Sequence, residues 1–199
     1  MIETASTPLK LTICGLDELA GHCVPGVTHV LSILDPGWPE PEPIRNFDLN
    51  RRLKLNFHDV IEPVAGWIAP ERCDVELLLA FGRNLDEVIG DAGAQASDAH
   101  LLVHCHAGLS RSTASAILLL AQHQPQRTAH DVVGQVIRLR PRAWPNLRII
   151  EIGDQLLGRD GEIIASVGML YRLALDREPG LAEAMMSAGR GRELAAAGI

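Results

Sequence analysis

The residues best suited to chemistry in this sequence are a cysteine and an arginine in one short segment. Cys105 and Arg111 have five residues between them in the run HCHAGLSRST, residues 104–113. A thiolate is a strong nucleophile, and a guanidinium offers a planar pair of N–H donors that matches two phosphoryl oxygens. Five residues suffice to wrap a phosphoryl group with inward-pointing backbone N–H groups. The spacing therefore predicts attack on phosphorus by Cys105, with Arg111 binding the phosphoryl oxygens and a phosphocysteine intermediate to be hydrolysed.

The elements around this segment would favour that chemistry. Residues 101–103, LLV, form an apolar run typical of a central strand covered on both faces. Gly108 indicates a tight turn, and the apolar residues from Ile117 to Leu120 predict a helix beginning near Ser110. The free N–H groups and dipole at such a helix start attract an anion, and the same field favours a thiolate at Cys105.

The residues next to these two receive supporting roles. Ser112 follows the arginine, where its hydroxyl can turn back to the cysteine sulfur and stabilise the departing thiolate when the intermediate is hydrolysed. His106 either lines the pocket or faces solvent. Metal binding is not expected of the run 104–106, HCH, because adjacent residues on an extended chain point to opposite sides. The loop residues expected to contact the substrate phosphate are His106, Ala107, Gly108, Leu109, Ser110 and Arg111.

Strands alternate with helices along the chain. Residues 9–14, 27–34, 53–57 and 101–103 are predicted strands, and residues 36–43, PGWPEPEP, a proline-rich loop. Helices are predicted from near Pro70, after Ser110, after Thr128 as a capping residue, and from Asn146 to Gly158, with a small-residue linker at 90–99. This order predicts an α/β fold with a mainly parallel central sheet flanked by helices.

The segment HCHAGLSRST resembles the H-C-x5-R-S/T signature of the protein tyrosine phosphatase superfamily. Its Ala-Gly-x-Ser-Arg-Ser interior is most similar to the dual-specificity branch, and RPRAWPN at 140–146 resembles the Arg-Pro…Pro-Asn segment of that branch. The resemblance covers roughly residues 9–158 and suggests a bacterial-type member. It implies the phosphatase fold of the phosphotyrosine protein phosphatase II-like type, and catalysis without metal or organic cofactor.

The resemblance also implies a general acid, an aspartate on a separate upstream loop that protonates the leaving oxygen. Asp59 is the first candidate because it follows the alternating strand Leu53–Phe57, where the acid loop begins in that family. Asp35 is the second candidate, and Asp48 also lies in a predicted loop. The segment from Asp59 to Cys105 is longer than is usual in the branch, and the linker at 90–99 accounts for the excess.

The expected substrate is a phosphorylated protein or a small phosphate ester. The chain has one tyrosine, Tyr171, and none before Cys105, so the tyrosine that deepens the pocket of tyrosine-specific members is missing. The pocket is therefore expected to accept phosphoserine and phosphothreonine besides phosphotyrosine. Two other functions stay open: a rhodanese-like sulfurtransferase, which also places a cysteine at a helix start, and a non-enzymatic phosphoprotein-binding module. Arsenate reduction would need a resolving cysteine near Cys105, and none lies nearby in sequence.

Composition limits the remaining possibilities. With 199 residues and 47% hydrophobic residues, the chain can form one folded domain. The formal charge of -7 argues against a nucleic-acid partner. No apolar run approaches the roughly 20 residues of a membrane span, and no secretory signal is visible, so neither a membrane partner nor export is expected. The cysteines follow no disulfide or zinc spacing, so we expect a cytoplasmic protein: Cys14, Cys23, Cys73 and Cys105.

We expect residues 1–158 to form the phosphatase domain. Residues 159–199 are rich in Gly, Ala and Arg and are expected to be a C-terminal extension, either helical or partly flexible. The sequence leaves the oligomeric state open.

Overall fold

The computed structural model describes residues 9–91, 99–178 and 180–199. Its centre is a four-stranded sheet with the order β1-β4-β2-β3, in which every pair of neighbouring strands is parallel. The predicted α/β fold with a parallel sheet is thus confirmed, and all four predicted strands are present. The strands are β1 (Lys10–Cys14), β2 (His29–Leu34), β3 (Arg52–Asn56) and β4 (His100–His104).

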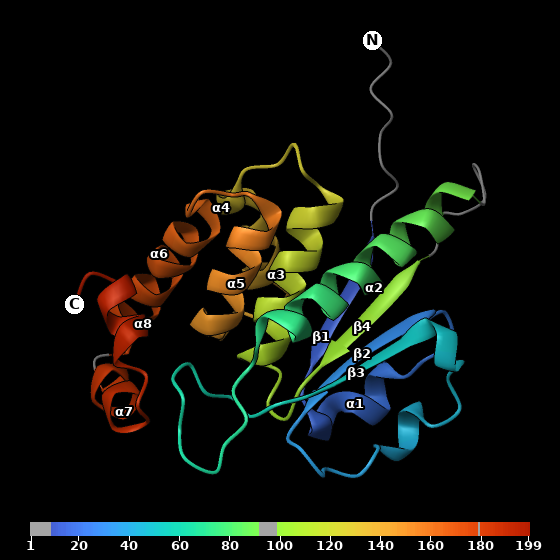
Figure 1. Cartoon of the computed structure of the whole chain (residues 1–199), viewed down its shortest axis with the longest axis horizontal. Helices are drawn as coiled ribbons and strands as arrows, with labels where there is room; N and C mark the ends of the chain where they lie inside the picture. Colours follow the sequence, from blue (N-terminus) through green and yellow to red (C-terminus); the bar gives the residue numbers. More distant parts are fainter. Residues whose placement is uncertain (1–8, 92–98, 179) are drawn as a thin grey trace.

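Alternate residues of the strands face two different layers, as the period of two requires. Leu101 and Val103 of β4 belong to the larger core, which most of the helices cover, whereas Leu102 belongs to a smaller core with Leu19 of α1 (Leu16–His22). Figure 1 shows the short helix α1 on one side of the sheet and the longer helices on the opposite side. Because both faces are covered, β4 is apolar throughout its centre.

Four elements in the N-terminal half of the chain differ from the prediction or extend it. Helix α1 was not predicted: it has seven residues, and its N-cap is Gly15, which gives no side-chain signal. Two 3-10 turns, η1 (Glu42–Ile44) and η2 (Leu49–Arg51), precede β3. Helix α2 (Arg72–Asp91) begins near the predicted position but continues into the expected linker, whose residues 92–98 lie outside the described residues.

The first three helices after β4 begin where they were predicted. Helix α3 (Arg111–His123) begins directly after the cysteine segment. Helix α4 (Ala129–Leu139) is capped by Thr128, whose Oγ1 accepts the N–H of Asp131 at 3.1 Å. Helix α5 (Leu147–Leu157) is capped by Asn146 and ends at Gly158, whose φ of 63° is the left-handed conformation typical of a helix end.

The described residues of the C-terminal stretch form three helices. They are α6 (Glu162–Arg177), α7 (Leu181–Ser187) and α8 (Gly191–Ala196). Helix α6 packs against α4 and α5, and its buried Tyr171 and Leu170 belong to the larger core together with Leu194 of α8. Among the described residues, no helix combines the length and the apolar character needed to cross a bilayer.

Candidate active site

The segment between β4 and α3 forms a loop at the carboxyl edge of the sheet, and Gly108 determines its path. Gly108 has a φ of 71°, and a Cβ atom there would lie 2.4 Å from the carbonyl carbon of Cys14. Both the left-handed conformation and the contact with the end of β1 therefore require glycine. The strand β1 thus packs directly against the turn that carries Cys105.

The carbonyl groups of this loop are bonded outward to the surrounding scaffold. The carbonyl of His106 accepts from the N–H of Leu16, and those of Leu109 and Ser110 accept from the N–H groups of Trp144 and Asn146. The guanidinium of Arg140 donates to the two carbonyls between them, those of Ala107 and Gly108. All five carbonyls from residue 106 to residue 110 are therefore held by the scaffold.

The backbone N–H groups of the loop, unlike its carbonyls, mostly have no hydrogen-bond partner among the described residues. That of Gly108 donates to the Sγ of Cys105 at 3.2 Å. The N–H groups of residues 106, 107 and 109–112 donate to no other described residue. A half-buried loop whose carbonyls are bonded to the scaffold and most of whose N–H groups have no protein partner has the donors that an oxyanion would need.

Cys105 lies within this ring of donors and is 2% exposed. Its Sγ is 3.2 Å from the Oγ of Ser112 in the first turn of α3, in addition to the contact with Gly108. Both contacts come from the N-terminal end of α3 or from the loop that leads into it. The arrangement provides donors that can stabilise negative charge on the sulfur.

Arg111 is the first residue of α3 and is 4% exposed. Its Nη1 donates to the Oδ1 of Asp35 and to the carbonyl of Phe57, both at 2.7 Å. Its Nε is buried and has no hydrogen-bond partner. One edge of the guanidinium is thus fixed by the scaffold, while an N–H on the other edge has none of the partners that a buried donor requires.

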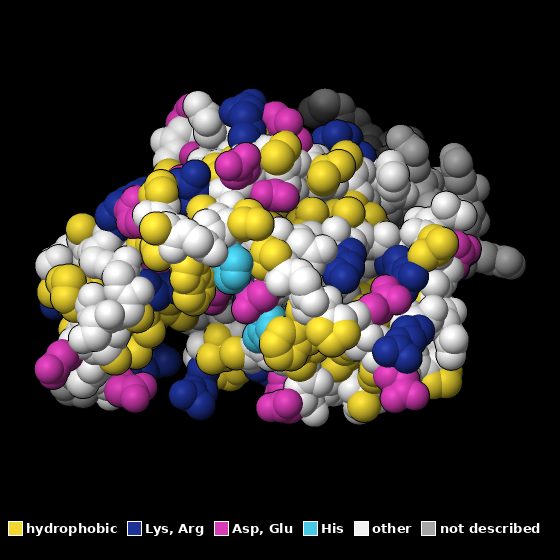
Figure 2. Space-filling view, turned by 60° about the horizontal axis from the view of Figure 1, so that its bottom comes forward, with side chains coloured by type: hydrophobic (Ala, Val, Ile, Leu, Met, Phe, Trp, Pro, Cys, Tyr) yellow, Lys and Arg dark blue, Asp and Glu magenta, His cyan; other side chains and the backbone are white. Residues whose placement is uncertain are grey.

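Asp35 and His106 form one wall of the site together with Trp38. The Nε2 of His106 lies 3.2 Å from the backbone N of Asp35 and 3.4 Å from its Oδ1. Burial lowers the pKa of His106, although the nearby carboxylate of Asp35 acts in the opposite direction. Trp38, from the proline-rich loop, packs edge-on against the His106 ring with centroids 4.5 Å apart. Histidine, acidic and hydrophobic side chains lie close together on this face of the molecule (Figure 2).

Asp59 lies on the other side of the loop, after β3. Its Oδ1 accepts the hydroxyl of Ser110 and the Nδ2 of Asn146, both at 2.8 Å, and lies 3.3 Å from the Nη1 of Arg190. No described residue forms a hydrogen bond with its Oδ2, and the side chain is 30% exposed. Asp59 therefore has one fixed oxygen and one oxygen free for exchange with solvent or substrate.

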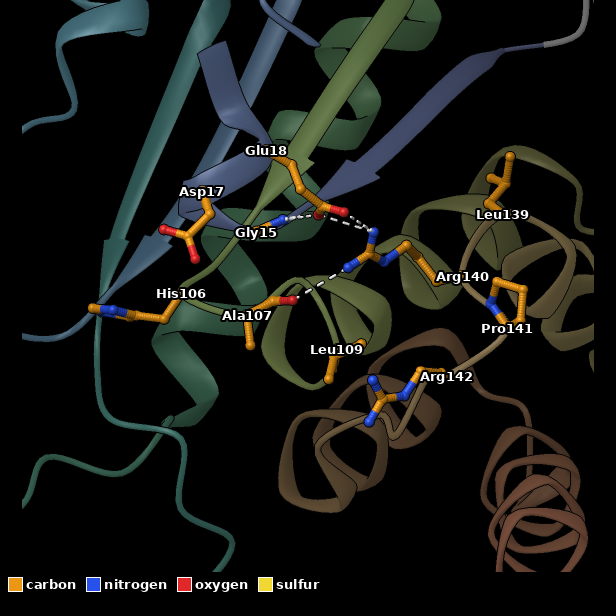
Figure 3. Close-up of a pocket in the computed structure, with 10 residues that line it drawn as sticks. All are labelled: Gly15, Asp17, Glu18, His106, Ala107, Leu109, Leu139, Arg140, Pro141 and Arg142. Atoms are coloured by element: carbon orange, nitrogen blue, oxygen red, sulfur yellow. Dashed lines mark hydrogen bonds and ion pairs between the residues drawn. The ribbon is translucent and has the colours of Figure 1, made fainter. Parts of the chain in front are cut away.

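Arg140 braces the outer side of the loop (Figure 3). Its Nε and Nη2 donate to the carbonyls of Gly108 and Ala107 at 3.1 and 3.2 Å, and its Nη1 binds both oxygens of Glu18 at 2.9 Å. Glu18 in turn accepts the N–H of Gly15 at 2.8 Å. A cavity of about 450 Å³ opens beside this brace, with Arg142 on its rim. The brace joins α1, the loop and the end of α4.

His104 ends the central strand beneath the loop. It is fully buried, and its Nε2 lies 2.6 Å from the Oγ of Ser32 on the neighbouring strand. Burial lowers its pKa to about 4, so the ring is neutral at pH 7. This contact ties the base of the loop to the sheet.

The structure brings most of the predicted site residues together. Cys105 and Ser112 are in contact, and Arg111 lies between them in sequence at the start of α3. Asp35 contacts His106 and Arg111, and Asp59 contacts Ser110. Asp48 instead precedes β3 and caps the turn η2, so it lies at the opposite edge of the sheet. The prediction that Ser110 begins the helix is confirmed, although its hydroxyl binds Asp59 rather than capping α3.

Four contributors to the site were not predicted. Arg140 stood within the RPRAWPN segment, so a signal for it existed, but no role was assigned. Glu18, Trp38 and Arg190 had no signal in sequence, because each reaches the loop from a distant part of the chain.

Comparison with known proteins agrees with this architecture. No protein-family model matches the sequence, and a search of curated proteins finds no match. Among solved structures, a human tyrosine phosphatase-like serine/threonine/tyrosine-interacting protein is 18% identical, with a TM-score of 0.54 over 75% of this chain and 92% of that one. The PTP-2 phosphatase of Cydia pomonella gives 18% and 0.53, covering 75% and 86%. Human DUSP28 gives 19% and 0.53, covering 75% and 88%.

The chain therefore has the fold of the dual-specificity branch of the protein tyrosine phosphatase superfamily. The predicted phosphatase fold is confirmed, and the bacterial-type assignment stays a prediction.

Proposed function

We propose that this protein is a cysteine-dependent phosphatase that hydrolyses phosphate monoesters of proteins. The observation that carries the proposal is the ring of unpartnered donors around Cys105: the backbone N–H groups of the loop together with the buried Nε of Arg111. Unpaired buried donors cost free energy, and a phosphoryl group would satisfy them. The fold shared with dual-specificity phosphatases supports the same conclusion.

In the first step, the Cys105 thiolate attacks phosphorus opposite the ester oxygen. The S–P bond forms while the P–O bond to the leaving group breaks. Loop N–H groups and Arg111 stabilise the charge on the three equatorial oxygens, and Asp59 gives its proton to the departing oxygen. Its Oδ2 is the oxygen available to hold that proton, because Oδ1 already accepts from Ser110 and Asn146.

In the second step, water attacks the phosphocysteine and the S–P bond breaks. Asp59, now ionised, accepts a proton from the attacking water. The departing sulfur regains its negative charge, and the hydroxyl of Ser112, 3.2 Å away, stabilises it. Inorganic phosphate then leaves the loop.

Asp59 suits the acid role better than Asp35. The Oδ1 of Asp35 accepts from the guanidinium of Arg111 at 2.7 Å, and its backbone N–H is engaged by His106. Those contacts make Asp35 the residue that orients Arg111. Asp59 contacts the loop through Ser110 without touching Arg111, so its Oδ2 can carry a proton without disturbing the arginine that would bind the phosphate.

The rim of the site favours an aromatic phosphate ester. Trp38 is 44% exposed and packs against His106, so its ring offers an apolar surface beside the phosphate position. A phenyl ring can pack against this surface, whereas a phosphoserine side chain is too short to use it. We therefore infer phosphotyrosine as the preferred substrate, with phosphoserine and phosphothreonine accepted less well.

The test is hydrolysis of p-nitrophenyl phosphate in the presence of EDTA. Wild-type turnover should persist, and Cys105→Ser and Arg111→Ala should abolish it. Asp59→Asn should lower the turnover of p-nitrophenyl phosphate only slightly, and should lower the turnover of esters with poorer leaving groups much more. No turnover by folded wild type would overturn the proposal. Tight binding of a phosphopeptide would then indicate a binding module, and transfer of sulfur from thiosulfate to cyanide would indicate a sulfurtransferase.

A further inference from the structure

Arg190 connects the C-terminal helices to the site. It lies at the N-terminal end of α8, and its side chain is 11% exposed. The Nη2 donates to the Oγ of Ser110 at 3.0 Å, and the Nη1 lies 3.3 Å from the Oδ1 of Asp59. Arg190 therefore contacts both the 105–111 loop and the candidate acid.

Glu193 fixes Arg190 from the other side. Its carboxylate is fully buried and accepts from the Nε and Nη2 of Arg190, both at 2.7 Å. The same carboxylate accepts the N–H of Leu147 at 3.2 Å, at the start of α5, and the indole N–H of Trp144. A negative charge at a helix start is favourable, and a buried ion pair with this many hydrogen bonds has little freedom to move.

The guanidinium of Arg190 is charged at any working pH. Burial alone would lower its pKa, but the hydrogen bonds that it donates to Glu193 and the nearby carboxylate of Asp59 outweigh burial and raise the pKa above its ordinary value. A permanent cation bonded to two carboxylates and one hydroxyl fixes the relative positions of all three.

The effect on Asp59 is geometric. Ser110, Asn146 and Arg190 all approach Oδ1, from the loop, the start of α5 and the start of α8. With Oδ1 held from three sides, the Asp59 carboxyl has little freedom to shift, and this restricts the positions open to Oδ2. A general acid gains efficiency from such fixed placement.

We propose that Arg190 is a positioning residue for the general acid: it holds the Asp59 carboxyl and the Ser110 hydroxyl in one arrangement, so that residues 190–193 complete the active site. This inference rests on the proposed phosphatase function. It assigns the C-terminal helices a part in proton transfer to the leaving group.

The test compares two substrates that differ in leaving group. p-Nitrophenyl phosphate scarcely needs a proton on its leaving oxygen, whereas phenyl phosphate does. In Arg190→Met, kcat/KM for phenyl phosphate should fall about tenfold more than for p-nitrophenyl phosphate, part of the roughly 100-fold effect expected for Asp59→Asn. Arg190→Lys, which keeps the charge, should recover part of the loss. In the Asp59→Asn background, Arg190→Met should change the substrate ratio less than about twofold, because the two residues act through one carboxyl.

Two further variants control for general effects of the substitution on the fold. Arg172→Met removes an exposed arginine of α6 and should leave both rates unchanged. Arg190→Met with Glu193→Gln avoids an unpaired buried carboxylate and should show the same substrate ratio as Arg190→Met alone. Equal losses on both substrates, or full additivity with Asp59→Asn, would overturn the positioning role while leaving the phosphatase function intact. Absence of Cys105-dependent turnover in wild type would instead overturn both.

Discussion

The 105–111 loop and residues 159–199 contribute to the same site in different ways. The loop carries the proposed nucleophile Cys105, the unpartnered N–H groups and Arg111 in one contiguous segment. The C-terminal stretch supplies single contacts from separate helices: Tyr171 of α6 donates to the carbonyl of Pro145, and Arg190 binds Asp59 and Ser110. Chemistry is thus concentrated in a short run of sequence, whereas the positions of the reacting groups depend on residues far away in the chain.

This difference leads to graded expectations. Changes in the loop should remove activity or stability outright, and changes in the brace or in the C-terminal helices should reduce them by smaller factors.

The largest effect is expected for Arg111→Lys. Lysine keeps the charge but loses the planar fork and the contact that orients it on Asp35, so kcat/KM should fall about 1,000-fold. Steady-state kinetics on p-nitrophenyl phosphate measure it. Arg72→Lys, at an exposed ion pair on α2, is the matched control and should have no effect. Retention of activity within about threefold would mean that Arg111 acts only as a charge.

Gly108→Ala should cost about 3 kcal/mol of unfolding free energy, because it combines a left-handed φ with a backbone overlap. Urea unfolding measures the change. Gly134→Ala, in the middle of α4 with room for a methyl group, should instead stabilise by about 1 kcal/mol. If both substitutions gave the same small change, the close packing of β1 on the loop would be wrong.

Arg140→Met should lower kcat/KM about tenfold while the protein stays folded, because the carbonyls of Ala107 and Gly108 lose their partner and the donor ring loosens. Arg138→Met, at an exposed position in the last turn of α4, two residues before Arg140, should leave the rate unchanged. Identical rates for the two variants would show that the brace does not shape the loop.

Tyr171→Phe should have the smallest effect on activity. The ring can keep its stacking on Trp144, but the carbonyl of Pro145 loses its donor, so unfolding free energy should fall by about 1 kcal/mol. Activity should stay within about twofold of wild type, since Asn146 and Arg190 still hold Asp59. A tenfold loss of kcat/KM with unchanged stability would show that α6 controls the site more directly than its contacts indicate.

The parts of the fold that follow from local signals were predictable. The strands showed their apolar runs, Thr128 and Asn146 showed their capping roles, and Gly108 marked the turn. Helix α1 was not predicted because its seven residues and glycine cap carry little periodic or capping information. The hydrogen bond from Arg111 to Asp35 and the ion pair between Arg190 and Asp59 join residues that are 76 and 131 positions apart. No local pattern encodes such pairings.

The site shows the same division. The loop between strand and helix that carries Cys105 and Arg111 was predictable from one run of ten residues, because the signals for a loop at a helix start are local; the catalytic roles of the two residues stay predictions. Three contacts could be identified only from the tertiary structure. They are the contact of Asp35 with Arg111, that of Arg140 with the loop carbonyls, and that of Arg190 with Asp59. Asp59 as the acid stays a prediction that the leaving-group comparison will decide.

The most direct test of the central claim is to trap the covalent intermediate. Rapid denaturation at neutral pH during turnover of p-nitrophenyl phosphate, followed by mass spectrometry of the peptides, should find one phosphoryl group on Cys105. The Ser112→Ala variant should accumulate more of it, because the departing thiolate loses its hydrogen-bond donor. Continued turnover with no phosphorylated Cys105 in either protein would contradict the account.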